Sequence, residues 1–177
     1  MIFVPKKSRE IYKLIIAHRG LHLDHPENTI SSFKAAIDKK LAIETDVRIT
    51  KDNILVCYHD RYLRRLLNLK GKIIDYTYDE LNKKLIKNSN EIVPKFEDVL
   101  KLVKGKVVLL LEIKGGINKK LKSELCRLLN TYDGKVYFHA KNILTYFYIK
   151  FIFGSQVFFI LNPFRKRFNF IKVHTNI

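Results

Sequence analysis

Continuous apolar runs alternate with amphipathic segments along almost the whole chain, and this alternation constrains the fold more than any other feature. The runs at 14–17, 42–49, 54–58, 107–113, 135–139 and 156–161 have the length of buried strands. Apolar residues at helical spacing fill the intervals 30–37, 78–87, 95–104, 118–132 and 142–153. Strands that are apolar throughout and are separated by helices are typical of a parallel sheet covered on both faces. The sequence therefore predicts an α/β domain over residues 1–161.

Both ends of the chain differ from this pattern. Segment 162–177 carries four Lys and Arg residues and no acid, so it is treated as a basic C-terminal tail. The first ten residues carry four charges and lack the apolar stretch of a secretory signal. Two cysteines, Cys57 and Cys126, cannot form a disulfide framework. These features predict a cytoplasmic protein.

The charge balance favours an anionic partner. The chain has 34 Lys and Arg against 17 Asp and Glu, a net charge of +17. Because no nucleic-acid-binding motif is recognisable, we expect a small anionic substrate and no specific nucleic acid. Segment 143–161 is long enough to cross a bilayer, but Lys150 and Gly154 lie near its middle. We expect a buried helix and a strand there, no membrane span, and at most peripheral contact with an anionic membrane.

Polar clusters interrupt or directly follow the first four predicted strands. They are His18-Arg19, Glu44-Thr45-Asp46, His59-Asp60 and Glu112-Ile113-Lys114. Alternation along a strand puts both acids of the second cluster on one face, and likewise the acid and the lysine of the fourth. Each cluster alone is typical of a surface ion pair or a core histidine. Their recurrence on successive strands indicates a shared site, because the ends of parallel barrel strands meet at one mouth.

The clusters supply three kinds of chemical group. The hard oxygen ligands, suited to Mg²⁺ or Ca²⁺, are Glu44, Asp46 and Glu112. The imidazoles, able to act as general acid and general base near neutral pH, are His18 and His59. The donors able to hold a phosphate are Arg19 and Lys114. Together these groups indicate cleavage of a phosphate ester.

Several motifs also carry a family resemblance. They include His-Arg-Gly at 18–20, Pro-Glu-Asn-Thr at 26–29, Glu-Thr-Asp at 44–46, His-Asp at 59–60 and Glu-Ile-Lys at 112–114. In their order and spacing the sequence resembles the glycerophosphodiester phosphodiesterase family, closely over 14–115 and in outline over 135–161. The resemblance implies a TIM-type (β/α)₈ barrel and hydrolysis of a glycerophosphodiester to glycerol 3-phosphate and an alcohol.

The resemblance also implies a role for each matched residue. His18 and His59 would be the acid/base pair, and Arg19 and Lys114 would hold the phosphate. The ligands of a divalent cation would be Glu44, Asp46 and Glu112. The residues that order the first loop or orient the site would be Glu27, Asn28 and Asp60. Either water or a substrate hydroxyl can then attack phosphorus.

The chain departs from the family pattern in length. A barrel of this type has about 250 residues, whereas this chain has 177 and contains no Trp. We expect an incomplete barrel of about six strands with impaired activity. Its open edge beside the first strand would be covered by the tail or by another subunit, as in a homo-oligomer. The alternatives are an inactive family remnant and a basic protein that binds nucleic acid or membranes.

Overall fold

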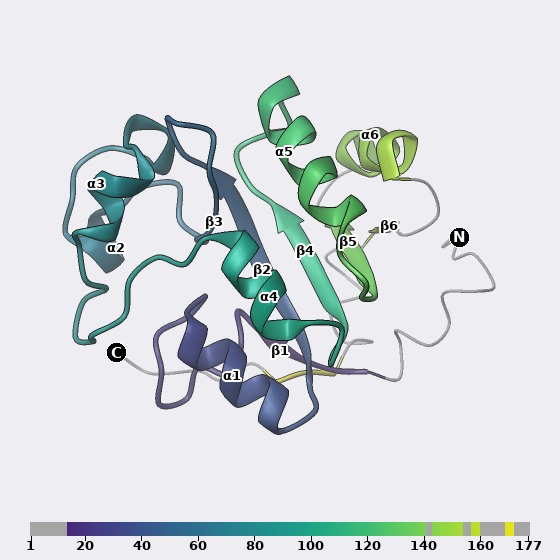
Figure 1. The fold of residues 1–177 in the computed structure, drawn as a ribbon, viewed down its shortest axis with the longest axis horizontal. Coiled ribbons are helices and arrows are strands. Elements are labelled where there is room, and N and C mark those ends of the chain that lie inside the picture. The colour runs from purple at the N-terminus through teal and green to yellow at the C-terminus, as the bar shows by residue number, and fades with distance from the viewer. Residues whose placement is uncertain (1–13, 141–142, 154–156, 160–168, 172–177) are drawn as a thin grey trace.

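The computed structural model describes residues 14–140, 143–153, 157–159 and 169–171. The strands are β1 (Ile15–His18), β2 (Ala42–Ile49), β3 (Leu55–Cys57), β4 (Leu109–Ile113), β5 (Val136–Ala140), β6 (Val157–Phe159) and β7 (Asn169–Ile171). The helices are α1 (Ile30–Asp38), α2 (Arg64–Leu67), the 3₁₀ helix η2 (Ile73–Asp75), α3 (Tyr78–Asn82), α4 (Phe96–Val103), α5 (Lys119–Asn130) and α6 (Ile143–Phe153). The predicted alternation of strands and helices is visible in Figure 1.

The sheet follows the chain order of a barrel wall. Its strands lie in the order β6-β5-β4-β2-β1-β7, and every neighbouring pair is parallel. The last described strand returns to the first, with Phe170 opposite Ile16. A sheet whose first and last strands meet has the topology of a barrel. This confirms the predicted fold class, an incomplete TIM-type barrel, since no described strand joins β6 to β7.

One predicted strand is present but does not belong to the parallel barrel wall. The run at 54–58 forms β3, which pairs with β2 antiparallel, with Cys57 opposite Val47. The connection over 50–54 is too short for the crossover that a parallel pair needs, and Asn53 makes the turn with a φ of 67°. The hairpin returns the chain to the middle of β2, where Tyr58 N donates to Asp46 O at 2.9 Å. The next residue, His59, is thereby brought to the level of the second cluster.

Local signals explain where the helices start and stop. The Thr29 and Ser32 side chains each accept from the other's backbone N–H, and this capping box begins α1. The helices expected over 95–104 and 118–132 are confirmed as α4 and α5. The helix expected over 78–87 ends at Asn82. Beyond it, Ile86 N and Lys87 N donate to Glu91 O and Leu66 O, so these contacts replace further helical turns.

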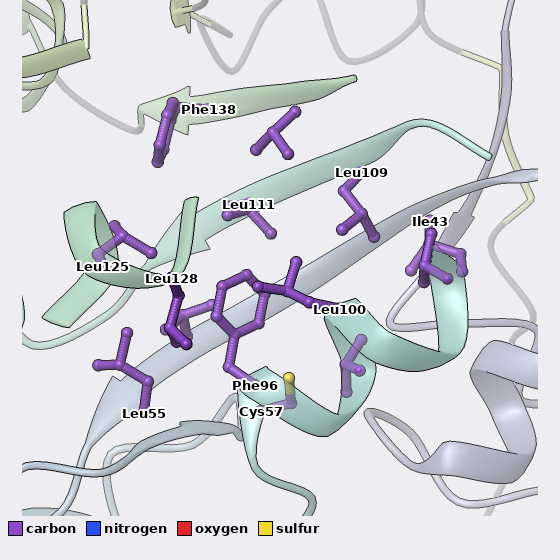
Figure 2. Close-up of a cluster of buried hydrophobic side chains, with 14 of the residues drawn as sticks. Ile43, Leu55, Cys57, Phe96, Leu100, Leu109, Leu111, Leu125, Leu128 and Phe138 are labelled. Atoms are coloured by element: carbon purple, nitrogen blue, oxygen red, sulfur yellow. The ribbon is translucent and has the colours of Figure 1, made fainter. Parts of the chain in front are cut away.

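The two faces of the sheet carry different side chains. Helices α1, α4 and α5 cover one face, where their apolar residues meet Ile43, Leu109 and Leu111 (Figures 1 and 2). Because strand side chains alternate, Glu44 and Glu112 lie on the opposite face. In a barrel that opposite face is the interior. The apolar core therefore lies on the outer, helix-covered face of the sheet, and the carboxylates lie on its inner face.

The expectations for the ends of the chain are only partly covered by the described residues. Residues 169–171 fall in the predicted tail and form β7 on the edge of β1, so the chain covers this edge itself. The remaining tail and residues 1–13, on which the cytoplasmic expectation rests, lie outside the described residues. In the part of the chain that the structure describes, no helix has both the length and the apolarity needed to span a membrane.

Gly20 provides a test of the close packing between the first loop and α1. Its φ is +80°, and a Cβ there would lie 2.8 Å from the backbone carbon of Ser32. Gly116 has a similar φ of +87°, but a Cβ there would meet nothing within 4 Å. We expect Gly116→Ala to lower the unfolding free energy by about 1 kcal/mol through backbone strain alone, and Gly20→Ala to lower it by about 2–4 kcal/mol because overpacking adds to the strain. Urea denaturation measures both, and equal losses would contradict the contact.

Candidate functional site

Parallel register brings the predicted polar clusters together on the inner face. His18 on β1 lies opposite Glu44 on β2. Two residues further along, Asp46 on β2 is opposite Glu112 on β4, which in turn is opposite His139 on β5. The five side chains thus form two adjacent rows across four strands. His139 was not among the predicted site residues, although it occupies the same place near the end of the fifth strand as Glu112 does on the fourth.

Three carboxylates at the centre of these rows are buried. Glu44 and Asp46 are each 1% exposed and Glu112 is 6% exposed. Burial, and then the charges of Asp46 and Glu112, raise the pKa of Glu44 well above its usual range. Lys114 Nζ lies 3.1 Å from Asp46 Oδ1 and also contacts Glu112 Oε1. Negative charge at this point calls for a cation beyond this lysine.

The geometry suits a divalent cation. Ligand atoms of Glu44, Glu112 and His139 all lie within 4.8 Å of one another. His139 Nδ1 is 3.3 Å from Glu112 Oε2 and is buried without a hydrogen bond among the described residues. Buried polar atoms left in this way beside carboxylates fit a metal ion. The residues present therefore fit the cation that the sequence implies. Of the predicted carboxylates, Glu44 and Glu112 belong to this group, His139 joins them, and Asp46 lies outside it.

Asp46 is oriented by the loop that follows β1. Asn28 Nδ2 donates to Asp46 Oδ2 at 3.0 Å, and Asn28 Oδ1 accepts from Thr45 Oγ1 at 2.8 Å. Arg19 Nε lies 3.5 Å from the same Asp46 oxygen, and Arg19 N donates to Glu44 Oε2 at 3.0 Å. Arg19 and Asn28 both have positive φ, and Asn28 N donates to Arg19 O across the turn. The loop therefore connects Arg19, which is expected to bind the phosphate, with Asp46, which is expected to bind the cation.

A second network holds His59. Its Nδ1 lies 2.8 Å from Asp60 Oδ1, and Arg65 binds both Asp60 and Glu27. Although burial opposes ionisation, the hydrogen bonds from His59 and Arg65 lower the pKa of Asp60. Since Asp60 is ionised, His59 Nδ1 is the donor, which leaves Nε2 for chemistry. Glu27 also accepts from Arg19 Nη1 at 3.0 Å, so Arg65 ties the loop after β3 to the loop after β1.

The two histidines are placed differently. His18 Nε2 lies 3.9 Å from Glu44 Oε2, beside the carboxylates. His59 follows the β2–β3 hairpin and lies beside Glu27 and Asp60, and Arg48 Nη2 donates to its carbonyl oxygen at 2.7 Å. Arg48 on β2 and Arg65 on α2 were not among the predicted residues because single arginines in a strand or a short helix carry no motif. Only the fold shows that both touch the segment that carries His59.

The neighbouring cysteine is unsuited to nucleophilic attack. Cys57 is buried in the apolar core behind β2. Burial raises the pKa of its thiol to about 12, so the thiolate is scarce at neutral pH. Figure 2 shows its sulfur among apolar side chains of the core.

Two relatives found by sequence comparison have the same enzyme name. The chain is 36% identical over 126 residues to a glycerophosphodiester phosphodiesterase of Bacillus altitudinis, covering 63% of this chain and 51% of the relative. It is 39% identical over 112 residues to one from Caldanaerobacter subterraneus subsp. tengcongensis, covering 59% and 46%. The chain therefore spans about half the length of the curated relatives it matches.

Solved structures share the fold. A glycerophosphoryl diester phosphodiesterase from Parabacteroides distasonis superposes with a TM-score of 0.68 at 26% identity, covering 82% of this chain and 53% of that one. An Oleispira antarctica phosphodiesterase, solved with the product sn-glycerol-3-phosphate, superposes with a TM-score of 0.73 at 23% identity, covering 87% and 70%.

The family profile covers the region in which the site is built. The Glycerophosphoryl diester phosphodiesterase family matches residues 18–150. This range begins at the first site histidine and includes every residue of both networks described above. A match over more than half of the chain, together with that geometry, shows that the chain belongs to the glycerophosphoryl diester phosphodiesterase family.

Proposed function

We propose that the chain hydrolyses glycerophosphodiesters to glycerol 3-phosphate and an alcohol, with a divalent cation bound among its buried carboxylates. The observation that carries the proposal is the convergence of His18, three carboxylates and two cationic donors on the inner face of one sheet. His59 lies in the adjoining network of Glu27 and Asp60, and Glu27 also binds Arg19. The names of the relatives and the product complex of the Oleispira antarctica enzyme support the same substrate class. The excess of positive charge on the chain also favours an anionic substrate.

The cation would be held by the inner carboxylates. Glu44 and Glu112 supply oxygen ligands, Asp46 lies beside them, and His139 can add a nitrogen. When bound, Mg²⁺ or Ca²⁺ would stabilise negative charge on the phosphate oxygens. Oxygen-rich coordination suits both of these ions.

The remaining residues would bind the phosphate and move protons. Arg19 and Lys114 flank Asp46 and present N–H donors to an anion placed next to the carboxylates. His59 has its ring held through Nδ1 by Asp60, so its Nε2 can exchange a proton with an ester oxygen. His18 is the partner that would take or give the other proton. Glu27, Asn28 and Asp60 would keep these groups in place through the contacts already described.

Catalysis by the histidines can be tested by substitution. In the presence of Mg²⁺ or Ca²⁺, His18→Ala and His59→Ala should each lower kcat for glycerophosphoglycerol by about 10²–10⁴-fold, because each removes a general acid or base. His25→Ala is the matched control, since His25 is exposed on the loop after β1. The assay is release of glycerol 3-phosphate. Full activity in either site variant would remove that histidine from the mechanism.

Cation binding can be tested without an activity assay. At one hundred times the Kd, Mg²⁺ or Ca²⁺ should raise the unfolding free energy of the wild-type chain by about 2.7 kcal/mol. Glu44→Gln should lose this stabilisation, whereas Asp38→Asn, which removes an exposed acid on α1, should keep it. Differential scanning fluorimetry with and without the cation measures the response. An unchanged response in Glu44→Gln would place the cation elsewhere.

The same variant makes a prediction about pH in the absence of metal. Because the folded-state pKa of Glu44 is raised, the protonated form stabilises the fold at low pH and this contribution is lost as the pH rises. Gln cannot ionise, so Glu44→Gln should become progressively more stable than the wild-type chain between about pH 5 and pH 8. Urea denaturation across this range, with a chelator present, measures the difference. A constant difference across the range would contradict the burial of an ionisable Glu44.

A further inference from the structure

A cationic cavity adjoins the site on the side of Lys114. It has a volume of about 410 Å³ and lies between the end of β2, η2 and the loop after β4. Four of its lining residues are cationic and none is acidic: Arg48, Arg61, Lys72 and Lys114. Gly115 and Gly116 form another part of the wall, and a Cβ on Gly116 would meet nothing within 4 Å. The space therefore remains open next to the positive groups.

The charge in this cavity is poorly compensated. Among the described residues, neither Arg61 nor Lys72 forms an ion pair with a carboxylate. Both cations instead lie near the exposed ring of Tyr62, at 5.6 Å and 5.9 Å from its centroid. Arg48 Nε is buried without a hydrogen-bond partner in the described part of the chain, and burial lowers the pKa of this guanidinium. An anion in the cavity would supply the negative charge and the hydrogen-bond acceptor that these groups lack.

The cavity lies where one of the two alcohol groups (arms) of a bound phosphodiester would extend. Lys114 lines the cavity and also contacts Asp46 and Glu112. Arg48, on the same wall, holds the carbonyl oxygen of His59. A phosphodiester bound between Arg19 and Lys114 would therefore extend one of its two arms into the cavity. A glycerol arm is neutral and would leave the cationic walls unsatisfied, so the arm that fits is one that carries negative charge.

We propose that this cavity binds a phosphate group on the alcohol part of the substrate, so that the preferred substrates are glycerophosphodiesters whose alcohol carries a second phosphate. The inference rests on the proposed phosphodiesterase function and specifies its substrate class. The bond that breaks is still the one between phosphorus and the alcohol oxygen, water supplies the new oxygen on phosphorus, and the products are glycerol 3-phosphate and a phosphorylated alcohol. The second phosphate takes no part in the chemistry and contributes binding alone.

The test compares two diesters that differ only in this group. One is glycerophosphoglycerol, and the other is the same compound with a phosphate monoester on the terminal hydroxyl of its leaving glycerol. We expect the wild-type chain, with Mg²⁺ at 0.1 M salt, to show a kcat/KM at least about tenfold higher for the phosphorylated diester. The double variant Arg61→Gln/Lys72→Gln should bring this ratio close to one. Arg61→Gln alone, at an exposed position, should lower it partially.

A matched variant controls for net charge. Lys34→Gln/Lys39→Gln removes the same two charges from exposed positions on and beside α1, which packs against α4 and not against η2. This control should keep the wild-type ratio. A wild-type ratio near one, or an equal fall in the ratio in both double variants, would overturn the inference.

Failure of the proposed function is distinguishable from failure of the inference. If neither diester is hydrolysed, the catalytic proposal fails. Titration calorimetry with inorganic phosphate, in the absence of divalent cations, then tests whether the cavity binds phosphate. The affinity for inorganic phosphate should fall at least about tenfold in Arg61→Gln/Lys72→Gln and remain unchanged in Lys34→Gln/Lys39→Gln. Equal affinity in the two double variants would show that the cavity does not bind phosphate.

Discussion

The parallel register of four strands is the constraint on which the rest of the structure depends. It places His18 beside Glu44, and Asp46, Glu112 and His139 in one row. Because side chains alternate along a strand, shifting β4 by one residue relative to β2 would put Glu112 into the apolar core and an apolar side chain into the site. The core formed with α1, α4 and α5 opposes such a shift, since Ile43, Leu109 and Leu111 are packed against these helices. Packing on the helix-covered face of the sheet thereby determines which acids meet on its inner face.

Concentrating the acids in this way is costly for folding. Burial and mutual repulsion raise the pKa of Glu44, and Lys114 together with Arg19 offsets only part of the charge. A structural core gains nothing from such an arrangement, whereas a bound cation would be stabilised by it. The antiparallel strand β3 serves the same site in another way, because it returns the chain from the end of β2 and delivers His59. Arg48 and Arg65 then hold the segment that carries this histidine from two sides.

Much of this arrangement was predictable from local pattern. The apolar runs identified the strands, the helical spacing over 30–37 identified α1, and the clusters named the carboxylates that converge. The position of β3 outside the barrel wall and the early end of α3 were not predicted, because they depend on turn length and on hydrogen bonds to distant segments. His139 was missed for a related reason: a single histidine in a strand is ordinarily a core residue, and only its register with Glu112 shows otherwise.

The sequence by itself determined the fold class, the family and the polar groups of the site, because strand and helix periodicity and motif order are properties of neighbouring residues. The tertiary structure alone decided what lies next to those groups. It brought β7 to the edge of β1, added His139 to the carboxylates, and gathered Arg48, Arg61 and Lys72 from separate segments around one cavity. These contacts join residues far apart along the chain, and their free energy depends on distances that no local pattern contains.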